Sequence, residues 1–140
     1  MDQSWFDAMA ADARNRPEVY QKLGVASLRL VVEEVGPDGA RRFGLVLDGY
    51  DVESMGEIAD VDAFGPDAVV SGPSEAWDDL VANIVRNGRA DGPHSLNALT
   101  IADIPLRVTA PDPMGRDKFF RYAETLQTLF DSLATAPIGV

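Results

Sequence analysis

Two stretches of alternating apolar and polar residues, joined by a tight turn, most constrain what this chain can fold into. The first, VASLRLVVEEV, begins at residue 25, and the second, RRFGLVLDGYDV, begins at residue 41. Alternation with a period of two predicts strands that each place one face in a core. The dipeptide Asp38-Gly39 between them is typical of a short hairpin turn. The sequence therefore predicts an antiparallel hairpin.

Further strands are expected after this hairpin. The segment EIADVDAF, residues 57–64, alternates apolar and acidic residues, and DAVVSG, residues 67–72, is a short apolar run before a glycine. A last strand is predicted near residue 106, with Ile104, Leu106 and Val108 on one face.

Apolar residues spaced by three and four positions predict helices in the remaining segments. An N-terminal helical segment covers residues 1–24. Another helix begins at Ser74, its predicted N-cap, and a short helical turn covers residues 95–99. The most regular stripe predicts a last helix from about Arg116 to Leu133. The apolar faces of the longer helices contain Trp5, Phe6, Met9, Ala13, Val19, Tyr20, Leu23, Trp77, Leu80, Val81, Ile84, Val85, Phe119, Tyr122, Ala123, Leu126, Leu129, Phe130 and Leu133.

The order of these elements predicts an α+β fold, with a largely antiparallel sheet covered by helices. Because 140 residues is the size of one ordinary domain, we expect residues 1–140 to form a single domain. Its N-terminal helical segment, 1–24, precedes the sheet and helices of residues 25–134, and residues 135–140 form a short tail.

The formal net charge of −11 disfavours partners that carry phosphate groups, whether nucleic acids or anionic membrane surfaces. Ten acidic residues lie between Phe43 and Val85, a stretch without lysine or arginine. A solvated acidic face is the simpler interpretation, and a docking surface for a basic partner is the alternative.

Several features favour a cytoplasmic protein. No run approaches the roughly 20 apolar residues that cross a bilayer, so we expect no stable membrane insertion. The N-terminus lacks the basic start and apolar centre of a signal peptide. The sequence contains no cysteine, which excludes disulfides and cysteine-ligated metals.

Motifs for catalysis, metals or nucleotides are absent. The single histidine, His94, stands next to Ser95 in a loop, where a base and a nucleophile rarely reach the geometry of a triad. Residues 60–65 begin like a calcium loop but have Phe64 at a ligand position. No phosphate-binding glycine motif occurs. We therefore expect no catalytic residue, no metal site and no cofactor.

One enzymatic alternative stays open, because a carboxylate that faces an apolar cavity can act as an acid or a base. Asp48, Asp51 and Glu53 lie on or just after a predicted strand. The simpler interpretation places all three on the outer surface.

The segments DAVVSGPSEAWDDLVANI, SLNALTIADIPLRVTAPDP and FFRYAETLQTLF, in this order, resemble the sterol carrier protein 2 family. The resemblance covers most of the chain from Leu28 onward and consists of apolar patterns rather than an invariant signature. One departure is Asp103, which stands where a glycine is common before the last strand. The residues in matching places are Gly72, Trp77, Leu80, Leu99, Ile101, Ile104, Leu106, Val108, Phe120 and Leu126.

This resemblance implies a five-stranded, largely antiparallel sheet covered by helices, and an apolar tunnel that carries fatty acyl chains, acyl-CoA or sterol-like lipids without catalysis. The implied lining residues are Trp77, Val81, Ile84, Leu96, Leu99, Phe120, Leu126 and Phe130. Arg116, Lys118 and Arg121 are the candidates for contact with a ligand head group. The main alternative is a filled core in an interaction or accessory domain, with a protein partner or a homodimer, and a small lipid-modifying enzyme is the second.

Overall fold

The computed structural model describes residues 1–135, so residues 136–140 of the expected tail lie outside the described part. A five-stranded sheet forms its centre, with the strand order β3-β2-β1-β4-β5. The strands are β1 (Ala26–Gly36), β2 (Gly39–Gly49), β3 (Asp51–Glu57), β4 (Ala68–Pro73) and β5 (Arg107–Thr109).

Most neighbouring strands in this sheet are antiparallel. β1 and β2 pair along their whole length, from Ala26 opposite Gly49 to Gly36 opposite Gly39, which confirms the predicted hairpin. β2 with β3 and β4 with β5 are also antiparallel, and only β1 and β4 run parallel. The expectation of an α+β fold with a largely antiparallel five-stranded sheet is therefore confirmed.

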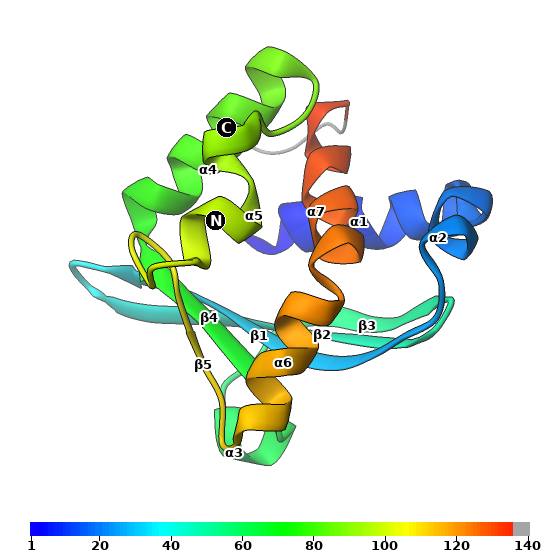
Figure 1. The fold of residues 1–140 in the computed structure, drawn as a ribbon. Coiled ribbons are helices and arrows are strands. Elements are labelled where there is room, and N and C mark those ends of the chain that lie inside the picture. Colours follow the sequence, from blue (N-terminus) through cyan, green and yellow to red (C-terminus); the bar gives the residue numbers. More distant parts are fainter. Residues whose placement is uncertain (136–140) are drawn as a thin grey trace.

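Helices cover the sheet mainly on one side, where Figure 1 shows α1, α4, α5 and α7. On the opposite side lies α3, whose Phe64 ring packs directly over Gly44 of β2. The helices are α1 (Gln3–Asn15), α2 (Pro17–Leu23), α3 (Val61–Phe64), α4 (Ser74–Asn87), α5 (Leu96–Thr100), α6 (Pro113–Arg121) and α7 (Ala123–Asp131), with short 3-10 turns at Gly92–His94 and Ser132–Ala134.

The prediction of a strand over residues 57–64 was wrong. The third strand precedes this segment, and residues 61–64 form α3 instead. The Asp60 carboxylate accepts a hydrogen bond from the Ala63 N–H at the start of α3, and Gly65 ends the helix with a left-handed backbone. These caps at the two ends of α3 stabilise the helix more than the alternating pattern favours a strand.

Three helix predictions also need correction. Ser74 is the first residue of α4, and the N-cap is Pro73, which has no side chain that can accept a hydrogen bond. Val85 lies on the exposed side of α4. The last helix is two helices, because the backbone leaves helical geometry at Tyr122.

The last strand is shorter than predicted. Only Arg107–Thr109 pairs with β4, and Ile104 is exposed in the loop before it. Leu106 and Val108 do face the core, as expected.

One close backbone contact joins α6 to the sheet. A Cβ atom at Gly115 would lie 1.9 Å from the carbonyl oxygen of Asp67, just before β4. No side chain fits at this position unless the backbone moves. Glycine is therefore required, because the backbones of α6 and of Asp67 approach each other so closely.

We expect Gly115→Ala to lower the free energy of unfolding by about 1–3 kcal/mol, because α6 must move away from the sheet. Gly92→Ala is the matched control, since nothing lies within 4 Å of the added methyl group. Urea denaturation followed by circular dichroism measures both. Equal stability of the two variants would contradict the close contact.

Candidate functional site

The residues predicted to line a tunnel do come together in the structure. All eight belong to, or pack against, the one core cluster between the helices and the sheet. Leu99 and Phe120 are half-buried, whereas the other six are buried: Trp77, Val81, Ile84, Leu96, Leu126 and Phe130.

Trp77 is the largest fully buried side chain of this cluster. Its indole N–H donates a hydrogen bond to the backbone carbonyl of Glu33 in β1 at 3.0 Å. Its ring stacks on Phe130 of α7, with centroids 5.9 Å apart and planes 18° apart. The role of Trp77 is therefore structural, because it joins α4 to the sheet and to α7.

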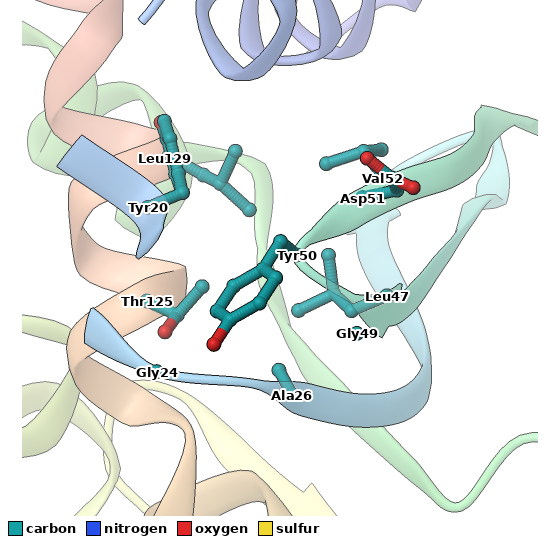
Figure 2. A pocket seen from close by; sticks show the side chains of 10 residues that line it. All are labelled: Tyr20, Gly24, Ala26, Leu47, Gly49, Tyr50, Asp51, Val52, Thr125 and Leu129. Atoms are coloured by element: carbon teal, nitrogen blue, oxygen red, sulfur yellow. The ribbon is translucent and has the colours of Figure 1, made fainter. Parts of the chain in front are cut away.

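A small hollow, partly open to solvent, lies at another place, where α2 and α7 meet the ends of β1 and β2 (Figure 2). Its volume is about 10 Å³, the size of one water molecule. In Figure 2 the Tyr50 ring lies between Thr125 of α7 and Leu47 of β2. None of the predicted tunnel residues lines this hollow, which is bounded by Tyr20, Gly24, Ala26, Leu47, Gly49, Tyr50, Asp51, Val52, Thr125 and Leu129.

A larger, open hollow lies on the surface between α5 and the joint of α6 and α7. It measures about 420 Å³ and brings together Phe120 and Arg121, a predicted ligand contact and a predicted head-group contact. The side-chain oxygen of Gln127, which lines the same hollow, accepts a hydrogen bond from the Leu96 N–H at 2.7 Å. This bond holds the start of α5 against α7.

The three cations predicted to meet a head group are each paired with an acid. Arg116 donates to the Val108 carbonyl at 2.5 Å and lies 3.4 Å from Asp103, with its guanidinium over the Phe120 ring. Lys118 lies 3.5 Å from Asp67. Arg116 therefore supports the fold, since it holds the loop before β5 to α6.

Arg121 is the cation best placed for a ligand. Its side chain is 60% exposed and its ion pair, 2.5 Å to Asp117, is one helical turn away on the surface. Such exposed pairs contribute little to stability, so the guanidinium can exchange Asp117 for another anion at small cost.

The carboxylates of the enzymatic alternative are exposed. Asp48, Asp51 and Glu53 border an open hollow of about 570 Å³ together with Arg14 and Gln21. All three side chains are exposed, whereas this kind of catalysis needs a carboxyl group that faces an apolar cavity.

His94 anchors a loop. Its Nδ1 lies 2.7 Å from Asp91 Oδ1, and Asp91 also accepts a hydrogen bond from the Asn83 amide at 2.9 Å. The Asn83 bond, followed by that of His94, lowers the pKa of Asp91. Ser95 instead donates to the Gly92 carbonyl and caps α5 through a bond from the Ala98 N–H, so it forms no pair with His94.

Within residues 1–135, no three His, Cys, Asp or Glu side chains are grouped so as to hold a metal ion. No helix in this part of the chain has the length and apolar character to cross a membrane.

Comparison with known proteins identifies the fold. No protein-family model and no curated protein matches the sequence. Solved structures do match: a crystal structure of sterol carrier protein 2 has a TM-score of 0.69 at 13% identity, covering 96% of each chain. This chain has a sterol carrier protein 2-like fold.

Two further structures agree with this sterol carrier protein 2-like fold. A conserved hypothetical protein from Thermus thermophilus, described as possibly a sterol carrier protein, has a TM-score of 0.56 at 13% identity, covering 97% of this chain and 87% of its own. The apo form of sterol carrier protein 2 from Yarrowia lipolytica has a TM-score of 0.52 at 15% identity, covering 93% and 89%. At such identities the likeness establishes the fold.

Tyr20, which lines the small hollow, forms a titratable pair with Asp12. The Tyr20 hydroxyl donates to Asp12 Oδ2 at 2.7 Å, and Arg16 donates two hydrogen bonds to the same carboxylate, each 2.7 Å. Burial alone would raise the pKa of Asp12, but the bonds from Arg16 and Tyr20 outweigh it and hold the pKa below its usual 3.8. Burial raises the pKa of Tyr20, and the bond to Asp12 adds to this.

A carboxyl whose pKa is lowered on folding stabilises the protein above its unfolded pKa, and this stabilisation is lost as pH falls through the folded pKa. We therefore expect Asp12→Asn to cost about 1 kcal/mol at pH 7 and to flatten the loss of stability below pH 4. Urea denaturation between pH 7 and pH 3 measures this, with the exposed Asp7→Asn as control. An unchanged slope in the Asp12 variant would contradict the assignment.

Proposed function

We propose that this protein binds and carries an apolar ligand, a fatty acyl chain, acyl-CoA or sterol-like lipid, without catalysis. The observation that carries this proposal is the likeness of fold to sterol carrier protein 2 over 96% of both chains. Transfer of apolar ligand surface from water into the core would supply the driving force, at roughly 25 cal/mol per Å².

The ligand would occupy space that side chains fill in this structure. Its walls would be the predicted residues of α4, α5 and α7, with Trp77 as their fixed support. Opening the core costs free energy, because the packed side chains lose their contacts with one another. The binding affinity is what remains after this cost.

The proposed mouth is the hollow between α5 and the α6–α7 joint. The final helix is interrupted at Tyr122, beside this hollow, so α6 and α7 can separate without breaking a continuous helix. Phe120 contributes apolar surface at the mouth, and Arg121 would bind a carboxylate or phosphate in place of Asp117.

The second candidate function is an interaction domain with a filled core. It is favoured by the full burial of Trp77 and by the stacking of its ring on Phe130. The exposed positions of Asp48, Asp51 and Glu53 argue against the lipid-modifying enzyme. The single domain, the cytoplasmic location and the absence of a cofactor stay predictions.

We expect each chain of the purified protein to bind one molecule of a fluorescent fatty acid such as cis-parinaric acid. Solvent extraction of the purified protein should also release co-purified lipid. Arg121→Ala should weaken fatty acid binding about three- to ten-fold, because a charge-assisted contact to the carboxylate is lost. Fluorescence titration measures the affinity, and native mass spectrometry measures the stoichiometry.

Arg86→Ala is the matched control, because Arg86 is an exposed cation near the end of another helix, α4. Its affinity should equal that of the unmodified protein. Absence of both co-purified lipid and fatty acid binding would refute the proposal in favour of the filled-core domain.

A further inference from the structure

The two most exposed large apolar side chains among residues 1–135 lie in one loop. Ile104 is 77% exposed and Ile101 is 72% exposed, and both belong to the segment of residues 101–105 that connects α5 to β5. Pro105 is exposed beside them. We call residues 101–105 the isoleucine loop. Figure 1 shows it at the margin of the molecule, between α5 and β5.

The isoleucine loop is held in place at both ends. The Asp103 N–H donates to the Thr100 carbonyl at 3.0 Å, and the Leu106 N–H donates to the Leu99 carbonyl at 3.1 Å. Leu106 is fully buried and packs against Gly72 of β4. The chain is therefore anchored directly before and after the two exposed isoleucines.

A polar contact also fixes the middle of the loop. Asp103 has a left-handed backbone with φ of 57°, and its carboxylate accepts a hydrogen bond from the Val108 N–H at 3.3 Å. The same carboxylate lies 3.4 Å from Arg116 of α6. The isoleucines are thus presented to solvent in a fixed arrangement, which lowers the entropy lost when a partner covers them.

The distribution of charge indicates the kind of surface that the loop fits. Residues 1–85 contain 17 acidic and six basic side chains, so they carry the whole net charge of −11. Residues 86–140 contain six of each and are neutral as a group. The loop itself contains one charge, that of Asp103, which Arg116 balances. The net charge of −11 would repel an anionic surface, so a neutral surface with an apolar interior is the better match for two exposed isoleucines.

The loop is also close to the proposed mouth. Ser95 and Asn97 at the start of α5 line the hollow, and the isoleucine loop follows the end of the same helix. Since α5 has five residues, about 7 Å along its axis separates the two features.

We propose that the isoleucine loop docks the protein reversibly on the surface of a zwitterionic lipid bilayer, with Ile101 and Ile104 at the boundary between head groups and acyl chains. This inference rests on the proposed function, because docking would place the mouth where an apolar ligand is collected or released. Two isoleucines supply a weak anchor, which suits brief docking rather than insertion.

The test is co-sedimentation with phosphatidylcholine vesicles. The unmodified protein should bind, and Ile101→Ser combined with Ile104→Ser should bind about 10- to 100-fold more weakly, because most of the buried apolar area is lost. Val25→Ser combined with Met114→Ser is the matched control, since these side chains are 62% and 71% exposed but lie outside the loop. The control should bind vesicles as the unmodified protein does. An equal loss of binding in both double variants would overturn the proposal.

A second variant reports directly whether residue 104 reaches the boundary between head groups and acyl chains. The tryptophan of Ile104→Trp should shift its emission to shorter wavelength on vesicles and be quenched by brominated phosphatidylcholine, whereas Trp5 and Trp77 are buried and should not respond. Absence of quenching, or dimerisation through the loop in sedimentation velocity without vesicle binding, would overturn the proposal. In the latter case the partner would be a second copy of the chain.

Titration with cis-parinaric acid in the absence of vesicles separates the two proposals. Fatty acid binding that is equal in the unmodified protein and in the isoleucine loop variant, together with loss of vesicle binding in the variant alone, would support docking. Fatty acid binding without any vesicle binding would overturn docking and leave the carrier function. Vesicle binding through the loop without fatty acid binding would support docking and refute the carrier function.

Discussion

The hydrogen bond from the Trp77 indole to the Glu33 carbonyl is the interaction on which the rest of the structure depends. It fixes α4, which follows β4 without a connecting loop, across the neighbouring strand β1. On the other face of the sheet the Glu33 carboxylate accepts hydrogen bonds from Arg42 of β2 and Ser71 of β4. One residue of β1 therefore joins two strands and a helix, and the stack of Trp77 on Phe130 extends this arrangement to α7.

The packing around Trp77 opposes ligand binding, whereas the interruption of the final helix favours it. Trp77 and most of the residues around it are buried in one core cluster, so a guest must displace side chains that already pack together. The final helix, however, is interrupted at Tyr122, and the exposed pair of Arg121 with Asp117 lies within α6, just before this interruption. The proposed mouth lies beside this interruption.

Much of the fold was predictable because the deciding signals are local. The alternating residues and the Asp38-Gly39 turn predicted the β1–β2 hairpin, and the stripe that contains Trp77 and Ile84 predicted α4. The strand predicted over residues 57–64 was wrong because caps at Asp60 and Gly65 decide such a short segment. Asp103, at a position where a glycine is common, adopts the left-handed backbone that glycine would favour, which aspartate tolerates better than most residues.

The sequence by itself determined the α+β class, the antiparallel hairpin and most of the side chains that enter one core, because each follows from periodicity and turn chemistry within a short segment. Only the tertiary structure decided that Trp77 is fully buried against Phe130, that Arg116 supports a loop while Arg121 is exposed, and that Ile101 and Ile104 face solvent. These outcomes depend on how side chains from distant segments fill or leave the same space, and no pattern within a single segment records that.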